Sequence, residues 1–299
     1  MADLAVHYYF GQSVLSSLQG QCSIDKGTFE FALSGPDDWF YCFTDRKKCP
    51  RGVYMHRYKT GAFLQALAAE PVLFSYCAGY LCHYLLDAAS HPYILARTGY
   101  YDGTRETRPF RGNHMAFERA LDRWILEEKE GKTLGTDGWH PMTDHMLGEP
   151  LPESLRQQIN HAYYMAYRWE DVFPDLLMAK QQMRKYLYIL ENPGNVARAV
   201  TEIVRHPLLR PILYSREYYQ GEDILNLSHA EWHHPKDVSL RSTLSFPELM
   251  EETRQEAVKV ILAVSRGDLS LIGNRSYLTG FDLDDIRNRA PGLYDLLEK

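Results

Sequence analysis

The sequence has no long apolar run. No stretch approaches the roughly 18 consecutive apolar residues that a membrane-spanning helix needs. The first residues, MADLAVHYYFGQSVL, carry an acid where a signal peptide would carry positive charge, and no clear cleavage site follows them. We therefore expect no transmembrane segment and a cytoplasmic protein. Its five cysteines, an odd number with no repeated CxxC spacing, are expected to be mostly reduced thiols.

An excess of charge of one sign is also missing. The net charge of -6 comes from 39 acidic and 33 basic residues, with no long run of either sign. This balance argues against a general nucleic-acid or anionic-membrane binder, although a local patch stays open. With 299 residues, 45% of them apolar and 13% aromatic, the chain has the composition of a folded globular protein.

Strand-like alternation is scarce, and helical patterns cover most of the chain, so the predicted fold class is all-α. The sequence SFPE at residues 245 to 248 is typical of a helix start. The expected helices span residues 3–19, 59–69, 72–90, 113–129, 152–172, 174–191, 194–204, 246–266 and 282–288.

The clearest break lies in GTDGWHPMTDHMLGEPLPES, which begins at residue 135 and contains three glycines and three prolines. We predict an N-terminal region over residues 1–135, a linker over 136–155 and a C-terminal helical region over 156–299. The two regions are expected either to be separate or to share one core.

The segment YLCHYLLDAASHPYI places His83, Asp87 and His91 at intervals of four residues. On a helix these side chains project from one face. Along the axis the two histidines are about 12 Å apart, too far to bind one ion comfortably, but Asp87 between them could bridge two ions. Pro92 disfavours helical geometry at His91. The alternative interpretation is a set of hydrogen-bonded polar residues on a partly solvated face.

A second pattern, NHMAFERALD, places His114, Glu118 and Asp122 at the same spacing. Imidazole and carboxylate one helical turn apart can bind one zinc ion, although such a pair more often lies on a surface.

Three more candidate ligands lie upstream of these helices. Asp37 follows the turn residues Gly35 and Pro36, His56 precedes a helix, and His7 lies in the first helix.

In this order, His7, the PD turn at Asp37, His56, HYLLDAASHP and the HxxxExxxD segment resemble the zinc-dependent phospholipase C family, which is related to P1-type zinc nucleases. The resemblance covers about residues 5 to 125. It implies a multi-helical phospholipase C or P1 nuclease-like bundle with a C-terminal helical extension.

The resemblance also implies a cluster of two or three Zn2+ ions. One zinc would be bound by Asp37, His56, His83 and Asp87, and a second by His91, His114 and Glu118. His7 would bind a third, with Asp87 as a bridge, and Asp37 matches a position proposed as the general base. This sequence departs from the family pattern in two ways. In secreted relatives a processed N-terminal tryptophan completes the third site, whereas residue 1 here is Met. The interval from Asp87 to His91 is two residues shorter here than in those relatives.

The implied function is hydrolysis of phosphate diesters by zinc-activated water, with a phospholipase C-type reaction on a phospholipid as the leading form. A nuclease or small-molecule phosphodiesterase is the alternative, although nucleic acid is not favoured as a partner. A zinc-binding protein without turnover is a further alternative.

Two other segments have simpler interpretations. The histidines of SHAEWHHPKD are expected in a surface or interface turn, with a second metal site as the alternative. Arg105, Arg108 and Arg111 are expected to be solvated loop charges, with phosphate binding as the alternative.

Overall fold

The computed structural model describes residues 4–43, 45, 47–48, 50–101, 104–131, 146, 151–191 and 219–288, with side chains of 186–191 excepted. It confirms the all-α prediction. The α-helices are α1 (Leu4–Leu18), α2 (Lys26–Ala32), α3 (Pro50–Arg57), α4 (Thr60–Ala68), α5 (Phe74–Thr98), α6 (Arg108–Glu130), α8 (Glu153–Tyr167), α9 (Val172–Glu191) and α13 (Phe246–Ser265). The 3-10 helices are η1 (Gly35–Tyr41), η2 (Pro71–Leu73) and η3 (Ile286–Asn288).

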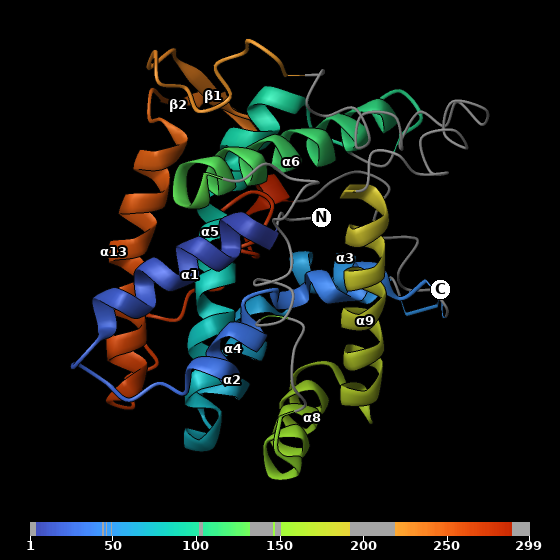
Figure 1. Cartoon of the computed structure of the whole chain (residues 1–299), viewed down its shortest axis with the longest axis vertical. Coiled ribbons are helices and arrows are strands. Elements are labelled where there is room, and N and C mark those ends of the chain that lie inside the picture. Colours follow the sequence, from blue (N-terminus) through green and yellow to red (C-terminus); the bar gives the residue numbers. More distant parts are fainter. Residues whose placement is uncertain are drawn as a thin grey trace.

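Helix α5 forms the centre of the molecule. It packs against α1, α2, α4, α6 and α13, and its buried residues cover every face of the helix over most of its length. Figure 1 shows α5 between α13 on one side and the α3, α8 and α9 helices on the other, with α6 crossing above it. A helix buried on all sides must be apolar all round except where polar groups find partners. The polar groups of α5 therefore mark its functional side.

The expectation that Pro92 disrupts the helix at His91 is wrong, because α5 continues through Pro92 to Thr98. Proline has no N–H, so the carbonyl of Ala88 receives no helical hydrogen bond from it. The backbone of Gly280 packs against this carbonyl, where a side-chain Cβ would collide with the oxygen. Gly280 also has a φ of +68°, which favours glycine. The C-terminal segment thus covers the point where proline interrupts the bonding of α5.

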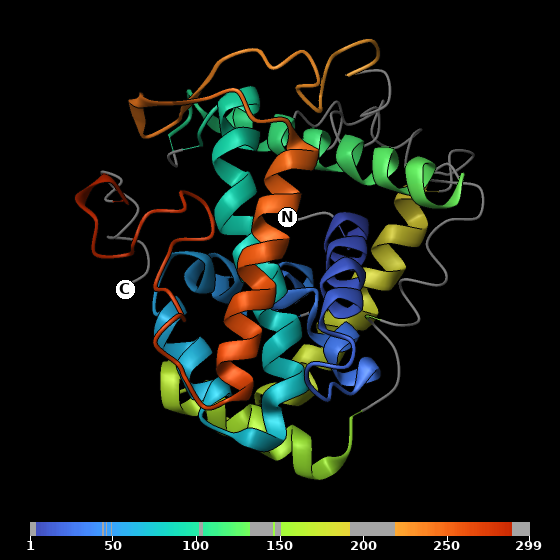
Figure 2. The same ribbon diagram turned by 90° about the vertical axis from the view of Figure 1, so that its left-hand side faces the viewer.

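Helix α13 begins as the sequence predicts. The Ser245 hydroxyl accepts a hydrogen bond from the Glu248 N–H, and the Glu248 carboxylate accepts one from the Ser245 N–H. This capping box fixes the start of the helix. From there α13 runs beside α5 and also contacts α1, as the turned view in Figure 2 shows.

Some elements differ from the sequence prediction or lie outside the described residues. The strands β1 (Trp232–His234) and β2 (Asp237–Ser242) form an antiparallel hairpin that was not predicted. Of the helix expected over 282–288, only the short η3 is present. The helix expected over 194–204 lies outside the described residues, as does most of the linker over 136–155.

A single apolar cluster runs through the described part of the chain, from Leu4 on α1 to Tyr277 near the C-terminal end. Residues of both predicted regions contribute to it, while their division into two regions stays a prediction. No single helix within the described ranges is long and apolar enough to cross a membrane; α4 joined to η2 and α5 passes that test only as a pair bent by 105°.

Candidate metal centre

The 3-10 helix η1 brings Asp37 to the centre of the molecule. It begins at Gly35, whose φ is +53°, and Pro36 follows. A Cβ at Gly35 would overlap the imidazole ring of His83, so only glycine allows this close approach. The turn predicted from the sequence thus places a carboxylate directly beside α5.

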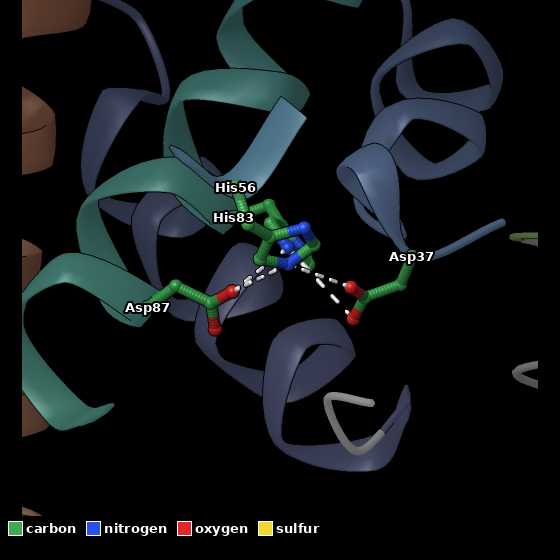
Figure 3. A group of neighbouring side chains, drawn as sticks. All are labelled: Asp37, His56, His83 and Asp87. Carbon is green, nitrogen blue, oxygen red and sulfur yellow. Dashed lines mark ion pairs between the residues drawn. The ribbon is translucent and has the colours of Figure 1, made fainter. Parts of the chain in front are cut away.

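Asp37, His56, His83 and Asp87 form the first group, shown in Figure 3, and all four are buried. The Nε2 atom of His56 is 3.0 Å from Oδ1 of Asp37, and Nε2 of His83 is 3.1 Å from Oδ2 of Asp87. Longer separations of 3.7 and 3.9 Å link each histidine to the other carboxylate. Ligand atoms of a tetrahedral zinc lie roughly 3.3 Å apart, since each is about 2.0–2.2 Å from the ion. The first group has this spacing.

Backbone carbonyls fix the orientation of three histidine rings. Nδ1 donates to Gly52 O at 2.7 Å in His56, to Leu33 O at 3.0 Å in His83, and to Tyr277 O at 2.9 Å in His91. A carbonyl only accepts, so each Nδ1 carries the proton. In the neutral ring Nε2 then presents a lone pair, the arrangement found in most metal-binding histidines.

His91, His114 and Glu118 form the second group, which joins α5 to α6. Oε1 of Glu118 lies 2.9 Å from Nε2 of His114 and 3.2 Å from Nε2 of His91. The two imidazole rings are stacked with centroids 5.2 Å apart. Three protein ligands leave one position of a tetrahedral ion open, as in catalytic zinc sites.

Asp87 connects the two groups, and His7 lies beside it. Oδ2 of Asp87 faces His83, whereas Oδ1 is 3.1 Å from Nε2 of His7 and 3.7 Å from Nδ1 of His91. The rings of His7 and His83 are stacked with centroids 4.0 Å apart. A carboxylate whose two oxygens face different histidines has the geometry of a bridge.

Several atoms of these groups are buried without a hydrogen-bond partner among the described residues. They are Nε2 of His83, Oδ2 of Asp87, and Nδ1 of His7 and His114. Leaving such atoms unsatisfied is costly, and a cation at the centre of the first group would satisfy the two that face it, Nε2 of His83 and Oδ2 of Asp87. The donor set of imidazole and carboxylate is the one that zinc prefers. The residues therefore fit a zinc site.

A family model described as zinc-dependent phospholipase C matches residues 6–188. The chain belongs to the zinc-dependent phospholipase C family. A search among curated proteins and a search among solved structures found no match. The matched span includes every candidate ligand predicted from the sequence, and it continues past residue 125, where the resemblance in the sequence motifs ends.

Neighbouring histidines keep the carboxyl groups of Asp37 and Asp87 ionised in this phospholipase C family member. Burial would raise the pKa of Asp87, but His91, His83 and His7 outweigh it and hold that pKa well below its usual range. Burial would likewise raise the pKa of Asp37, but His83 and His56 outweigh this effect and lower that pKa. Ionised carboxylates are the form that binds a cation.

The histidines divide into two kinds. Burial lowers the pKa of His7 and of His114, which favours the neutral ring that coordinates metal. Burial acts in the same direction on His91, but Asp87 and Glu118 outweigh it and raise the pKa of His91 to about 9. Without metal, His91 therefore carries a proton at neutral pH.

A cavity of about 190 Å³ opens beside both groups. Three histidines form part of its wall, one from the first group and two from the second. The lining residues are Phe40, Val53, His56, Arg57, His91, Leu95, Gly99, Tyr100, Tyr101, Phe110, Arg111, His114, Met115 and Leu278. A phosphate ester in this cavity would reach both groups.

The arginines predicted as loop charges differ from that prediction in part. Arg108 and Arg111 lie in the first turn of α6, and Arg111 lines the cavity. All three arginines are exposed, and Arg105 and Arg108 are not among the lining residues.

The histidines of SHAEWHHPKD lie in and before the β1–β2 hairpin, where His229 and His233 are exposed. The buried His234 contacts the Thr279 carbonyl through Nε2 at 2.8 Å. Within the described residues they join no group that could hold a metal, which agrees with the surface-turn interpretation.

Sequence reasoning missed Tyr277, which supports the site through its backbone. Its carbonyl accepts from His91, and its N–H donates to the carbonyl of His56 at 3.3 Å. Its ring also packs against those of His56 and His83. No sequence signal could reveal these contacts, because any residue type offers a backbone carbonyl.

The second missed residue is Lys180 on α9, which is buried. Its Nζ is 2.9 Å from Oδ2 of Asp38 and 2.6 Å from Oγ of Ser34. Burial lowers the pKa of Lys180 and raises that of Asp38. A lysine four residues after the apolar Leu176 gives no clear sign in the sequence of a buried ion pair.

Proposed function

We propose that this chain is a zinc-dependent hydrolase of phosphate diesters with a phospholipase C-type activity. The observation that carries the proposal is the pair of buried imidazole and carboxylate groups beside one cavity. Membership of the zinc-dependent phospholipase C family supports it. A phospholipid or a similar phosphodiester is the proposed substrate.

In this proposal the first group binds one zinc ion and the second group binds another. His7 contributes its side chain to a third ion that shares Asp87, so the cluster has two or three ions. Bound zinc would supply a Lewis acid for phosphate oxygens and lower the pKa of water towards 7. The cytoplasmic location stays a prediction.

The protein's own residues would do three things. The carbonyls of Gly52, Leu33 and Tyr277 hold the histidine rings in the orientation that exposes Nε2. The apolar wall of the cavity excludes bulk water and so strengthens electrostatic contacts with a bound phosphate. Asp37, buried and ionised at the edge of the first group, is the proposed acceptor of the proton from the attacking water.

Zinc content tests this proposal. We expect elemental analysis of protein purified without added metal or a metal-binding tag to give two or three zinc ions per chain. Asp87→Ala and Glu118→Ala should each lower that number, because each removes a carboxylate that two histidines face. His233→Ala, which removes an exposed histidine outside both groups, is the control. Zinc near zero in every variant, not restored by added zinc, would contradict the proposal.

Aromatic and basic residues around the cavity favour one alternative, a nuclease. Phe40, Tyr100, Tyr101 and Phe110 offer stacking surfaces, and Arg57 and Arg111 offer positive charge. Hydrolysis of a short-chain phospholipid should be compared with cleavage of a single-stranded oligonucleotide by the same zinc-loaded preparation. Faster cleavage of the oligonucleotide would replace the lipid assignment by the nuclease one.

A further inference from the structure

The charged residues of the cavity all have the same sign. Apart from its histidines, Arg57 and Arg111 are the charged lining residues, and no carboxylate lines the described wall. Arg57 lies at the end of α3 directly after His56, and Arg111 lies in α6 three residues before His114. Each arginine is therefore next to one of the two metal-binding groups.

Both guanidinium groups are available to a ligand. Within the described part of the chain neither Arg57 nor Arg111 forms a salt bridge, and Nε of Arg57 is buried without a hydrogen-bond partner. A buried donor without an acceptor is costly, and a bound anion would satisfy it. Guanidinium also matches the geometry of phosphate and carboxylate oxygens, to which it can donate two parallel hydrogen bonds.

A third cationic side chain lies beside a residue that lines the cavity. The ammonium of Lys236, from the turn between β1 and β2, is 4.0 Å from the centre of the Tyr100 ring. Tyr100 lines the cavity, and its ring already interacts with the ammonium group of Lys236. A quaternary ammonium group in the cavity would have to compete with Lys236 for the Tyr100 ring, and Arg57, Arg111 and Lys236 would repel it.

We propose that Arg57 and Arg111 select phospholipids whose headgroup carries a second negative charge, a phosphomonoester or a carboxylate, over phospholipids with a choline headgroup. This inference rests on the proposed function. The metal groups would hold the scissile phosphate, and the two guanidinium groups would bind the additional anion. The cavity of about 190 Å³ has room for a small headgroup, since one water needs only about 10–15 Å³ on the same scale.

The first experiment compares two substrates with identical short acyl chains, dihexanoyl phosphatidylinositol 4-phosphate and dihexanoyl phosphatidylcholine. We expect kcat/KM of the zinc-loaded enzyme to be at least about tenfold higher for the lipid with the second phosphate. Arg57→Gln and Arg111→Gln should each lower this ratio by about tenfold. Arg108→Gln, an exposed arginine on the same helix that does not line the cavity, is the matched control and should keep the ratio.

A substrate with a single phosphate separates the two possible roles of the arginines. For bis(p-nitrophenyl) phosphate, the loss caused by Arg57→Gln or Arg111→Gln should be about tenfold smaller than for the phosphoinositide. Equal losses on both substrates would show that the arginines act on the scissile phosphate, which would overturn the inference. Preference of the wild type for the choline lipid, or faster arginine-dependent cleavage of a single-stranded oligonucleotide, would also overturn it.

Binding gives a readout that does not depend on turnover. Calorimetric titration of inositol 1,4-bisphosphate and of phosphocholine into the zinc-loaded protein should show tighter binding of the bisphosphate, weakened about tenfold or more by either arginine substitution. If this pattern appears but no phosphodiester is hydrolysed, the proposed function fails while the anion selection stands. If neither substitution weakens the bisphosphate, the selection fails whatever the activity. Thermal unfolding of each variant shows whether it is folded.

Discussion

Asp87 is the residue on which the candidate metal centre depends most. Its two oxygens face histidines from α1 and α5, and it is buried. A single carboxylate shared in this way couples the two groups, because moving it towards one set of histidines moves it away from the other. Removing it should therefore lower metal binding at more than one position, as the zinc measurement tests.

At the residue scale, His91 predicts that zinc binding releases protons. Its pKa is raised to about 9 by Asp87 and Glu118, so in metal-free protein the ring is charged at pH 7. Zinc binds only the neutral ring, so at least one proton must leave, and zinc affinity should fall about tenfold for each pH unit between 9 and 7. Calorimetric titration of zinc into metal-stripped protein, in buffers of different ionisation enthalpy at pH 7, measures the number of protons released per zinc ion bound.

Glu118→Ala is the comparison for this measurement. It removes one of the two acids that raise the pKa of His91, so fewer protons should leave when zinc binds to the remaining ligands. Proton release that is absent in the wild type, or unchanged in the variant, would contradict the assignment.

The candidate ligands were accessible from the sequence because their spacing is regular and their order matches a family. His83, Asp87 and His91, and likewise His114 and Glu118, follow the four-residue repeat of a helix face. Asp37, His56 and His7 lie outside these repeats, and only the resemblance assigned them to particular ions. Arg57 had no signal at all, because a lone arginine at a helix end is usually solvated.

At the scale of elements, the position of η1 depends on a contact with α9. Lys180 donates to the carbonyl of Phe31 at 2.9 Å and pairs with Asp38, which is adjacent to Asp37. A buried lysine is retained only where partners compensate for its lost hydration. Lys180 is therefore a positioning residue for the turn that carries Asp37.

Lys180→Met should lower the free energy of unfolding by about 3–5 kcal/mol, because it leaves the Asp38 carboxylate buried without its counter-ion. The double variant Lys180→Met with Asp38→Asn should lose less. Urea denaturation at neutral pH measures both. Because Asp37 neighbours Asp38, zinc per chain should also fall in the single variant. Equal stability of the two variants would contradict the role given to this pair.

Long periodic helices were predicted well, and short elements were not. The pattern of residues 3–19 and 246–266 corresponds to α1 and α13 within a residue or two. The short α2 was missed because seven residues give too little periodicity. The prediction at Pro92 failed because α5 continues past the proline, where the backbone of Gly280 packs against the carbonyl of Ala88 that proline leaves without a helical hydrogen bond.

For the whole molecule, metal is expected to contribute to stability. Each group places carboxylates and histidines together in the core. An ion that binds only the folded chain stabilises it by mass action. At a free ion concentration a thousandfold above the Kd, the gain is about 4 kcal/mol. Chelation with EDTA should lower Tm by about 5 °C or more, and added zinc should restore it. Differential scanning calorimetry tests this.

The double variant Asp87→Ala with Glu118→Ala is the control for that experiment. It lacks a carboxylate in each group, so its Tm should respond little to EDTA or to zinc. An equal response of both proteins would assign the stabilisation to metal bound elsewhere.

The hydrogen bond between His91 and Tyr277 joins residues that are 186 positions apart in the chain. Contacts between residues so far apart form slowly, because the entropy cost of closing a long loop comes before the contact can stabilise the fold. Helix α5 can acquire its shape early, but the ring of His91 gains its hydrogen bond to the Tyr277 carbonyl only when the C-terminal segment docks. A segment that follows every candidate ligand in the chain therefore completes the centre, and metal is expected to bind after that segment has docked.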